Sequence, residues 1–180
     1  TVHHLLINHF SKFVMKGVKF ISNNETIMSL FHGFAHKILE QVDESKIQMF
    51  LDFINEVICD NNELVYEYVL NWISFIVQNP GKKSEIALVL KGLQGIGKNR
   101  FTDTLCEMMK GYSAKNITEI AELTGQFNSI VEGKMLIVLN ELKNCGDDRL
   151  ANFNALKSII TDAMIRINEK NQPRRCRECC

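Results

Sequence analysis

The sequence predicts an α/β protein in which a parallel sheet is flanked by helices, with an N-terminal helical segment before it. Two short apolar runs, 86–90 and 135–139, have the length of strands. The second run has no polar alternation, which is typical of a strand that a parallel sheet buries on both faces. A glycine-rich stretch, 92–99, follows the first run and leads into residues 100–110, where apolar residues recur at helical spacing. This order of strand, loop and helix predicts the fold class.

The stretch Gly92-Leu-Gln-Gly-Ile-Gly-Lys-Asn99 is typical of a phosphate-binding loop. Its glycines let the backbone turn so that successive N–H groups point toward phosphate oxygens at a helix N-terminus. Lys98 is expected to place its ammonium group near the β- and γ-phosphates. Asn99 departs from the usual pattern, in which Ser or Thr holds Mg²⁺, although an amide oxygen can take that role. The alternative to a phosphate-binding loop is a glycine-rich turn that binds no ligand.

A polar pair, Asn140 and Glu141, directly follows the second apolar run. Ligands of parallel sheets bind outside the carboxyl ends of the strands, so the pair is expected where Mg²⁺ and an attacking water would lie. Glu141 can polarise water as a general base, and Asn140 can ligate or orient the metal through a neutral oxygen. On the alternative interpretation, the pair simply begins a polar loop after a core strand.

Composition and charge exclude several classes of protein. The chain has 180 residues, enough for one domain and a small appendage, and its 46% apolar and 23% charged content is typical of a globular protein. Twenty-one basic residues balance 21 acidic ones, so any contact with nucleic acid must come from a local patch. We find no membrane-spanning stretch and no signal peptide, and we expect an intracellular protein that is not secreted. The start at Thr1 suggests a piece of a longer polypeptide.

The cysteines and histidines give weaker signals. The six cysteines do not form a disulfide framework, and Cys59, Cys106 and Cys145 suit reduced thiols. Near the end of the chain, residues 176 and 179 have half of a zinc-ligand spacing without a second pair, so a solvent-exposed tail is the preferred interpretation. Residues 32 and 36 are histidines one helical turn apart, but no third metal ligand accompanies them.

The sequence divides into four predicted segments: an N-terminal segment of uncertain fold, a helical subdomain, a core, and a tail, at 1–44, 45–83, 84–173 and 174–180. The first segment could include a strand at 18–21. The helical subdomain holds one helix from residue 45 and another over 64–78. The core is expected to contain further elements: a strand or turn at 111–114, helices over 117–123 and 150–161, and a strand over 164–168 that places Arg166 and Asn168 on one face.

Together these motifs resemble the ATPase domain of superfamily 3 helicases, of the primase–helicase type found in poxviruses, other large DNA viruses, phages and plasmids. The resemblance runs over 45–173 and depends on the ordered set of the glycine-rich loop, Leu123-Thr-Gly-Gln-Phe-Asn128, the Asn-Glu strand and Leu156-Lys-Ser-Ile-Ile-Thr161. It implies an AAA+-like P-loop NTPase core that forms a homo-hexamer and moves single-stranded DNA, with ATP and Mg²⁺ as cofactors.

The resemblance also implies roles for individual residues. Lys98 and Glu141 are the implied catalytic residues, and Asn99, Asn140 and Glu141 the implied Mg²⁺ site. The residues implied to bind the nucleotide are Gly92, Gln94, Gly95, Ile96, Gly97, Lys98, Asn99 and Arg100. A basic hairpin facing the central pore belongs to the same pattern, and the candidates for DNA contacts in the matching region are Lys157, Arg166 and Lys170.

One departure from the family pattern concerns the end of the chain. The pattern continues into a strand whose terminal Asn senses the γ-phosphate, and then to an arginine finger, but residues 174–180 do not resemble that strand. We therefore expect a C-terminally truncated core that binds nucleotide and hydrolyses it poorly. Two alternatives stay open: a degenerate nucleotide-binding relic or partner-binding module without motor activity, and a small-molecule kinase on a phosphate-loop scaffold.

Overall fold

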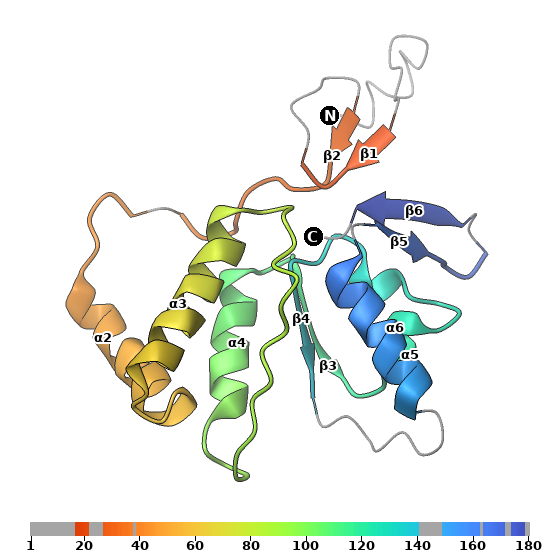
Figure 1. Cartoon of the computed structure of the whole chain (residues 1–180). Coiled ribbons are helices and arrows are strands. Elements are labelled where there is room, and N and C mark those ends of the chain that lie inside the picture. Colours follow the sequence, from red (N-terminus) through yellow and green to blue (C-terminus); the bar gives the residue numbers. More distant parts are fainter. Residues whose placement is uncertain are drawn as a thin grey trace. The chain divides into compact units, whose positions relative to one another are not determined.

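The structure, a computed structural model, describes residues 17–21, 27–37, 39–140, 149–162, 164–171 and 174–178. Contacts divide the chain into two compact units, Thr1–Gly33 and Phe34–Cys180 (Figure 1). The boundaries predicted after residues 44, 83 and 173 stay predictions. Among the described residues, every helix is too short or too polar to cross a lipid bilayer.

The first unit contains one small parallel sheet. Its strands are β1 (Gly17–Lys19) and β2 (Ile27–Ser29). The Ser29 hydroxyl donates to the carbonyl of Phe20, 3.1 Å away, and the Phe20 ring lies 5.6 Å from that of Phe31. A strand near residues 18–21 is predicted by the sequence, whereas β2 is not.

The second unit begins with the helices that the sequence predicts. Helix α2 (Glu44–Phe53) starts at Asp43, whose carboxylate accepts the Ser45 backbone N–H, and it continues as the π-helical turn η2 (Ile54–Ile58). Helix α3 (Glu63–Gln78) starts at Asn62, whose side chain caps it in the same manner. Both N-caps satisfy backbone donors that a helix leaves free at its first turn.

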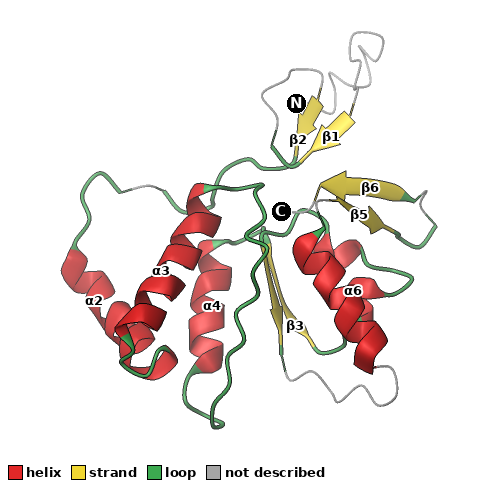
Figure 2. Cartoon of the chain, viewed as in Figure 1, coloured by secondary structure: helices red, strands yellow, loops and turns green. Residues whose placement is uncertain are grey.

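A parallel pair of strands forms the centre of this unit: β3 (Ser113–Ile117) and β4 (Leu136–Leu139). Alternate side chains of a strand point to opposite faces, and in β4 both faces are covered. Leu136 and Val138 belong to a first core with α3 and α4, whereas residues 137 and 139 pack on a second core with α5, α6 and β5. Figure 2 shows helices on both sides of these strands. The prediction of a strand buried on both faces is confirmed for β4.

The strand predicted at 86–90 is wrong, because this segment pairs with no described strand. Its side chains still alternate: Leu88 and Leu90 pack against the first core, whereas Val89 is 88% exposed. A strand is defined by hydrogen bonds to a neighbour, and an apolar run alone cannot supply one. The parallel sheet of the second unit therefore has two strands within the described residues.

The remaining elements of the second unit are α4 (Lys98–Met108), α5 (Ala121–Thr124), η3 (Ser129–Val131), α6 (Arg149–Thr161), β5 (Met164–Ile167) and β6 (Arg175–Glu178). The predicted helix over 150–161 and strand over 164–168 are confirmed as α6 and β5. The helix predicted over 117–123 begins later, because residues 113–117 form β3 instead. Strand β6 is not predicted by the sequence; it lies in the segment expected to be a tail and pairs antiparallel with β5.

Candidate functional site

The glycine-rich loop forms a tight turn that ends where α4 begins. Gly95 has a φ of 85° and Gly97 a φ of 101°, a region of backbone conformation that side chains disfavour. Helix α4 starts at Lys98, and no side chain caps its N-terminus. The first N–H groups of this helix and its dipole therefore face the loop, which is the arrangement that attracts an anion.

Gly97 is also required by a close approach. A Cβ atom placed on Gly97 would lie 2.9 Å from Cε2 and 3.0 Å from Cζ of Phe53, at the end of α2. The Phe53 ring stacks on Phe50, with centroids 6.3 Å apart, and Phe50 in turn lies 6.5 Å from Phe101 of α4. The loop is thus held against the first core by a row of aromatic rings.

Lys98 folds back over the loop that precedes it. Its Nζ donates to the backbone carbonyls of Gly92, 3.0 Å away, and Leu93, 2.7 Å away. Within the described residues, no carboxylate pairs with this ammonium group. Hydrogen bonds between ionised groups are stronger than bonds to neutral carbonyls, so a phosphate entering the loop would compete well for this amine.

Asn140 lies directly after β4. Its backbone N–H donates to the carbonyl of Ile117 at 2.9 Å, and its Nδ2 lies 3.5 Å from Oδ1 of Asn116. Figure 1 shows the carboxyl end of β4 and the loop before α4 at the same, lower end of the unit. Glu141 lies outside the described residues, so its position relative to Lys98 stays a prediction. Gln94 in the loop and Asn99 and Arg100 in the first turn of α4 are exposed.

The three candidates for DNA contacts come from three different elements. Lys157 is exposed on α6, Arg166 is exposed on β5, and Lys170 lies in the turn between β5 and β6. Arg166 lines a pocket, and neither lysine contributes to its wall. Whether the three side chains contact one DNA strand stays a prediction.

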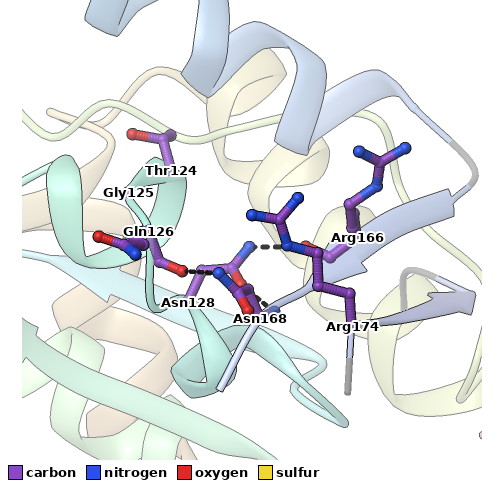
Figure 3. A pocket seen from close by; sticks show the side chains of 7 residues that line it. All are labelled: Thr124, Gly125, Gln126, Asn128, Arg166, Asn168 and Arg174. Carbon is purple, nitrogen blue, oxygen red and sulfur yellow. Dashed lines mark hydrogen bonds between the residues drawn. The ribbon is translucent and has the colours of Figure 1, made fainter. Parts of the chain in front are cut away.

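The pocket that Arg166 lines has a volume of about 420 Å³ and lies between the segment after α5 and the β5–β6 hairpin (Figure 3). Its wall is made mostly of polar residues and includes two guanidinium groups. The lining residues are Thr124, Gly125, Gln126, Asn128, Arg166, Asn168 and Arg174. Asn168 directly follows β5 and lines this pocket together with Arg166, in agreement with the alternation predicted over 164–168.

Asn128 joins the two sides of this pocket and is only 7% exposed. Its Nδ2 donates to the carbonyl of Arg166 at 2.9 Å, and its Oδ1 accepts the backbone N–H of Asn168 at 2.9 Å. Its own N–H donates to the carbonyl of Asn168 at 3.1 Å. The Asn128 side chain thus forms with Arg166 and Asn168 the kind of backbone hydrogen bonds that a neighbouring strand would form. No periodic pattern in the sequence marks it.

The described residues contain no cluster of three or more His, Cys, Asp or Glu side chains that could hold a metal ion. The pair at 32 and 36 does not lie on a helix, and the His36 Nε2 lies 2.9 Å from the carbonyl of Glu107 instead. Cys59 and Cys106 are buried free thiols, and burial raises the pKa of each. Cys145 and Cys179 lie outside the described residues.

Comparison with known proteins gives one family match. The profile of the family of unknown function DUF5906 matches residues 90–180, just over half of the chain. This range starts two residues before the glycine-rich loop and includes α4, both strands of the central pair and the β5–β6 hairpin. No curated protein matches the chain significantly.

Solved structures provide a second comparison. The apo structure of the NrS-1 C-terminal region (305–718) is similar to this chain with a TM-score of 0.72 and 26% identity. An A-form apo structure of the same region has a TM-score of 0.69 and 25% identity. Each match covers 91% of this chain and 40% of the other, so the chain spans less than half the length of its structural relatives. The mixed α/β arrangement is therefore shared with that region.

Proposed function

We propose that this chain, which belongs to the family of unknown function DUF5906, binds ATP at residues 92–100 and is part of a superfamily 3-type DNA helicase. The observation that supports this most strongly is the position of Lys98. Its amine lies on the carbonyls of Gly92 and Leu93, at the uncapped N-terminus of α4. An ammonium group and free backbone N–H groups thus meet at one loop, as a bound triphosphate requires.

The residues of the loop and of the strand end fit the two cofactors. Gly95 has open space around it, so the backbone of the loop is accessible to a phosphate, and Lys98 would hold the β- and γ-phosphates. Asn99 and Asn140 would offer amide oxygens to Mg²⁺, which prefers oxygen ligands and keeps several of its waters. ATP would supply the phosphoryl group. Lys98 would offset charge that develops on it, and Glu141 would accept a proton from the attacking water.

Single-stranded DNA and a homo-hexameric assembly are proposals that rest on the motif resemblance. The chain corresponds to 40% of the NrS-1 C-terminal region, so activity of a complete motor would involve residues beyond those compared.

The decisive experiment measures ATP affinity for the 180-residue chain and for Lys98→Ala by calorimetric titration with Mg²⁺ present. Loss of a charged partner of the phosphates should weaken binding by about 10-fold or more. The matched control is Lys110→Ala, just beyond the other end of α4, where an exposed ion pair with Glu107 contributes little to stability. Melting curves of both variants report whether the fold is retained. Unchanged ATP affinity in Lys98→Ala would show that the loop is not the nucleotide site.

A second variant separates hydrolysis from binding. Glu141→Gln is expected to keep ATP affinity and to stop phosphate release, measured with and without single-stranded DNA. Binding without any turnover in the unaltered chain, and with no acceleration by DNA, would favour the nucleotide-binding relic over the motor. ADP formation that requires a small-molecule acceptor and no DNA would favour a kinase.

A further inference from the structure

Strand β3 contains one residue whose backbone conformation is unusual for a strand. Asn116 has a φ of 64°, and among the described residues other than glycine it is the one with positive φ inside a strand. The register of β3 and β4 also shifts there, because β3 advances by three residues, from Ala114 to Ile117, where β4 advances by two. One residue of β3 is therefore extra, and a β-bulge of this kind points a side chain in a new direction.

The side chain of Asn116 meets Asn140 directly after β4. Oδ1 of Asn116 lies 3.5 Å from Nδ2 of Asn140, and the backbone N–H of Asn140 donates to the carbonyl of Ile117 at 2.9 Å. The last two residues of β3 thus hold Asn140 by its side chain and by its backbone. Because Nδ2 is turned toward β3, Oδ1 of Asn140 has no hydrogen-bond partner among the described residues and is the amide atom left for a ligand.

The difference between the two amide atoms matters for the proposed magnesium site. Mg²⁺ takes oxygen ligands in near-octahedral geometry, and an amide nitrogen is not one of them. The hydrogen-bond partners of an Asn side chain determine which of its two amide atoms faces a given direction, because only the nitrogen donates and only the oxygen accepts. An acceptor at residue 116 therefore determines whether Asn140 presents its oxygen or its nitrogen to a ligand.

Backbone conformation alone does not account for an amide side chain at residue 116. Glycine adopts positive φ at less cost than asparagine, and the exposed Asn116 side chain belongs to neither core. What glycine lacks is the acceptor oxygen that reaches Asn140. The contact is long for a hydrogen bond, and hydrogen bonds in catalytic sites often shorten once the substrate is bound.

We propose that Asn116 is a positioning residue of the ATP site: its Oδ1 holds the amide of Asn140, so that Asn140 keeps its oxygen available to Mg²⁺. This inference rests on the proposed function, and it adds a residue of β3 to a site otherwise made by the glycine-rich loop and the residues after β4. Partners of this kind orient metal ligands, and their removal weakens metal binding by about 10- to 100-fold.

The test compares the ATP affinity of the 180-residue chain with Mg²⁺ and with EDTA in calorimetric titrations, because the ratio of the two affinities isolates the contribution of the metal. Asn116→Gly retains the positive φ and should lower this ratio by about 10-fold or more, while its ATP affinity in EDTA stays within about 2-fold. Asn116→Asp keeps an acceptor oxygen and should recover the ratio. Electron paramagnetic resonance of Mn²⁺, titrated with the chain and a non-hydrolysable ATP analogue, measures the same loss on a metal that also binds oxygen ligands.

The matched control is Asn171→Gly, which replaces an exposed asparagine with the same φ of 64° in the turn between β5 and β6. It should leave the Mg²⁺ ratio within about 2-fold, and melting curves report whether each variant is folded.

The inference is overturned if Asn116→Gly keeps the Mg²⁺ ratio of the unaltered chain, if Asn116→Asp does not recover it, or if Asn171→Gly lowers it equally. If Lys98→Ala weakens ATP binding but Asn116→Gly leaves the ratio unchanged, the role of Asn116 alone is wrong. If the unaltered chain does not bind ATP, both this role and the proposed function are wrong.

Discussion

Replacing Gly97 by Ala should destabilise the protein more than replacing Gly95 by Ala, although the two glycines are in the same loop. Both positions have positive φ, 101° and 85°, so each alanine adopts a conformation that costs about 1–2 kcal/mol. The two positions differ in their surroundings. A Cβ at 97 would lie 2.9 Å from the Phe53 ring, whereas a Cβ at 95 meets nothing within 4 Å.

The extra cost at Gly97 is the displacement of the Phe53 ring. Forcing one methyl group into a packed site costs about 1–3 kcal/mol, so Gly97→Ala should lower the free energy of unfolding by about 2–5 kcal/mol in total. Urea unfolding followed by fluorescence measures this difference, because the sequence contains one tryptophan, Trp72, which packs against the first core. With a slope of about 2 kcal/mol per molar urea, a gap of about 2 kcal/mol is a midpoint shift of about 1 M.

A double-mutant cycle shows whether Phe53 causes the gap. Phe53→Leu shortens the side chain that the new methyl group would meet, and the difference between the two glycine variants should then fall below about 0.5 kcal/mol. Equal destabilisation by Gly97→Ala and Gly95→Ala in the unaltered background would refute the reasoning. So would a gap that Phe53→Leu leaves intact.

Two further predictions concern buried groups of the second unit. Asn128→Ala should lower the free energy of unfolding by about 1–3 kcal/mol, because the backbone groups of residues 166 and 168 lose their hydrogen-bond partners. The control is Asn154→Ala, at an exposed position on α6, which should change the free energy of unfolding by less than about 0.5 kcal/mol. Equal effects of the two substitutions in urea unfolding would contradict the prediction. In the folded protein, iodoacetamide should modify the exposed Cys176 before Cys59 and Cys106, since alkylation needs the thiolate and burial raises the pKa of both buried thiols. Equal labelling of Cys106 and Cys176 in peptide mass spectra would contradict this assignment. The contribution of the two buried thiols to the free energy of unfolding is complete below their ordinary pKa of 9.0 and is lost as pH rises through the raised value, so the melting temperature should fall in alkali.

The elements that could be predicted from the sequence are those whose pattern of apolar residues and glycines lies within one continuous segment. Helices α3 and α6 have apolar residues at helical spacing, and β4 is a continuous apolar run that both cores cover. The glycine-rich loop could be predicted for the same reason, because its glycines, its lysine and the following helix are contiguous. Its internal geometry has positive φ at two glycines, and the Lys98 amine lies on two loop carbonyls, a contact that the sequence does not predict.

The features that the sequence could not predict depend on distant partners. The run 86–90 has strand composition, but strand pairing needs a neighbour that composition does not specify. Strand β6 has no apolar alternation and exists through its register with β5, in which Arg166 lies opposite Cys176. The hydrogen-bond partners of Asn128 are 38 and 40 residues further along the chain, so no local pattern could identify it.

The two candidate sites are attached to opposite faces of the same strand. The glycine-rich loop rests on Phe53, which packs on the first core with Leu136 and Val138 of β4. The pocket lined by Arg166 and Arg174 lies beside β5. Ile167 of β5 packs in the second core, and Ile137 and Leu139 of β4 pack against the same core. Among the described strands, β4 is the one with side chains against both cores. A shift of β4 would therefore displace both cores, since close-packed interiors transmit strain and do not absorb it.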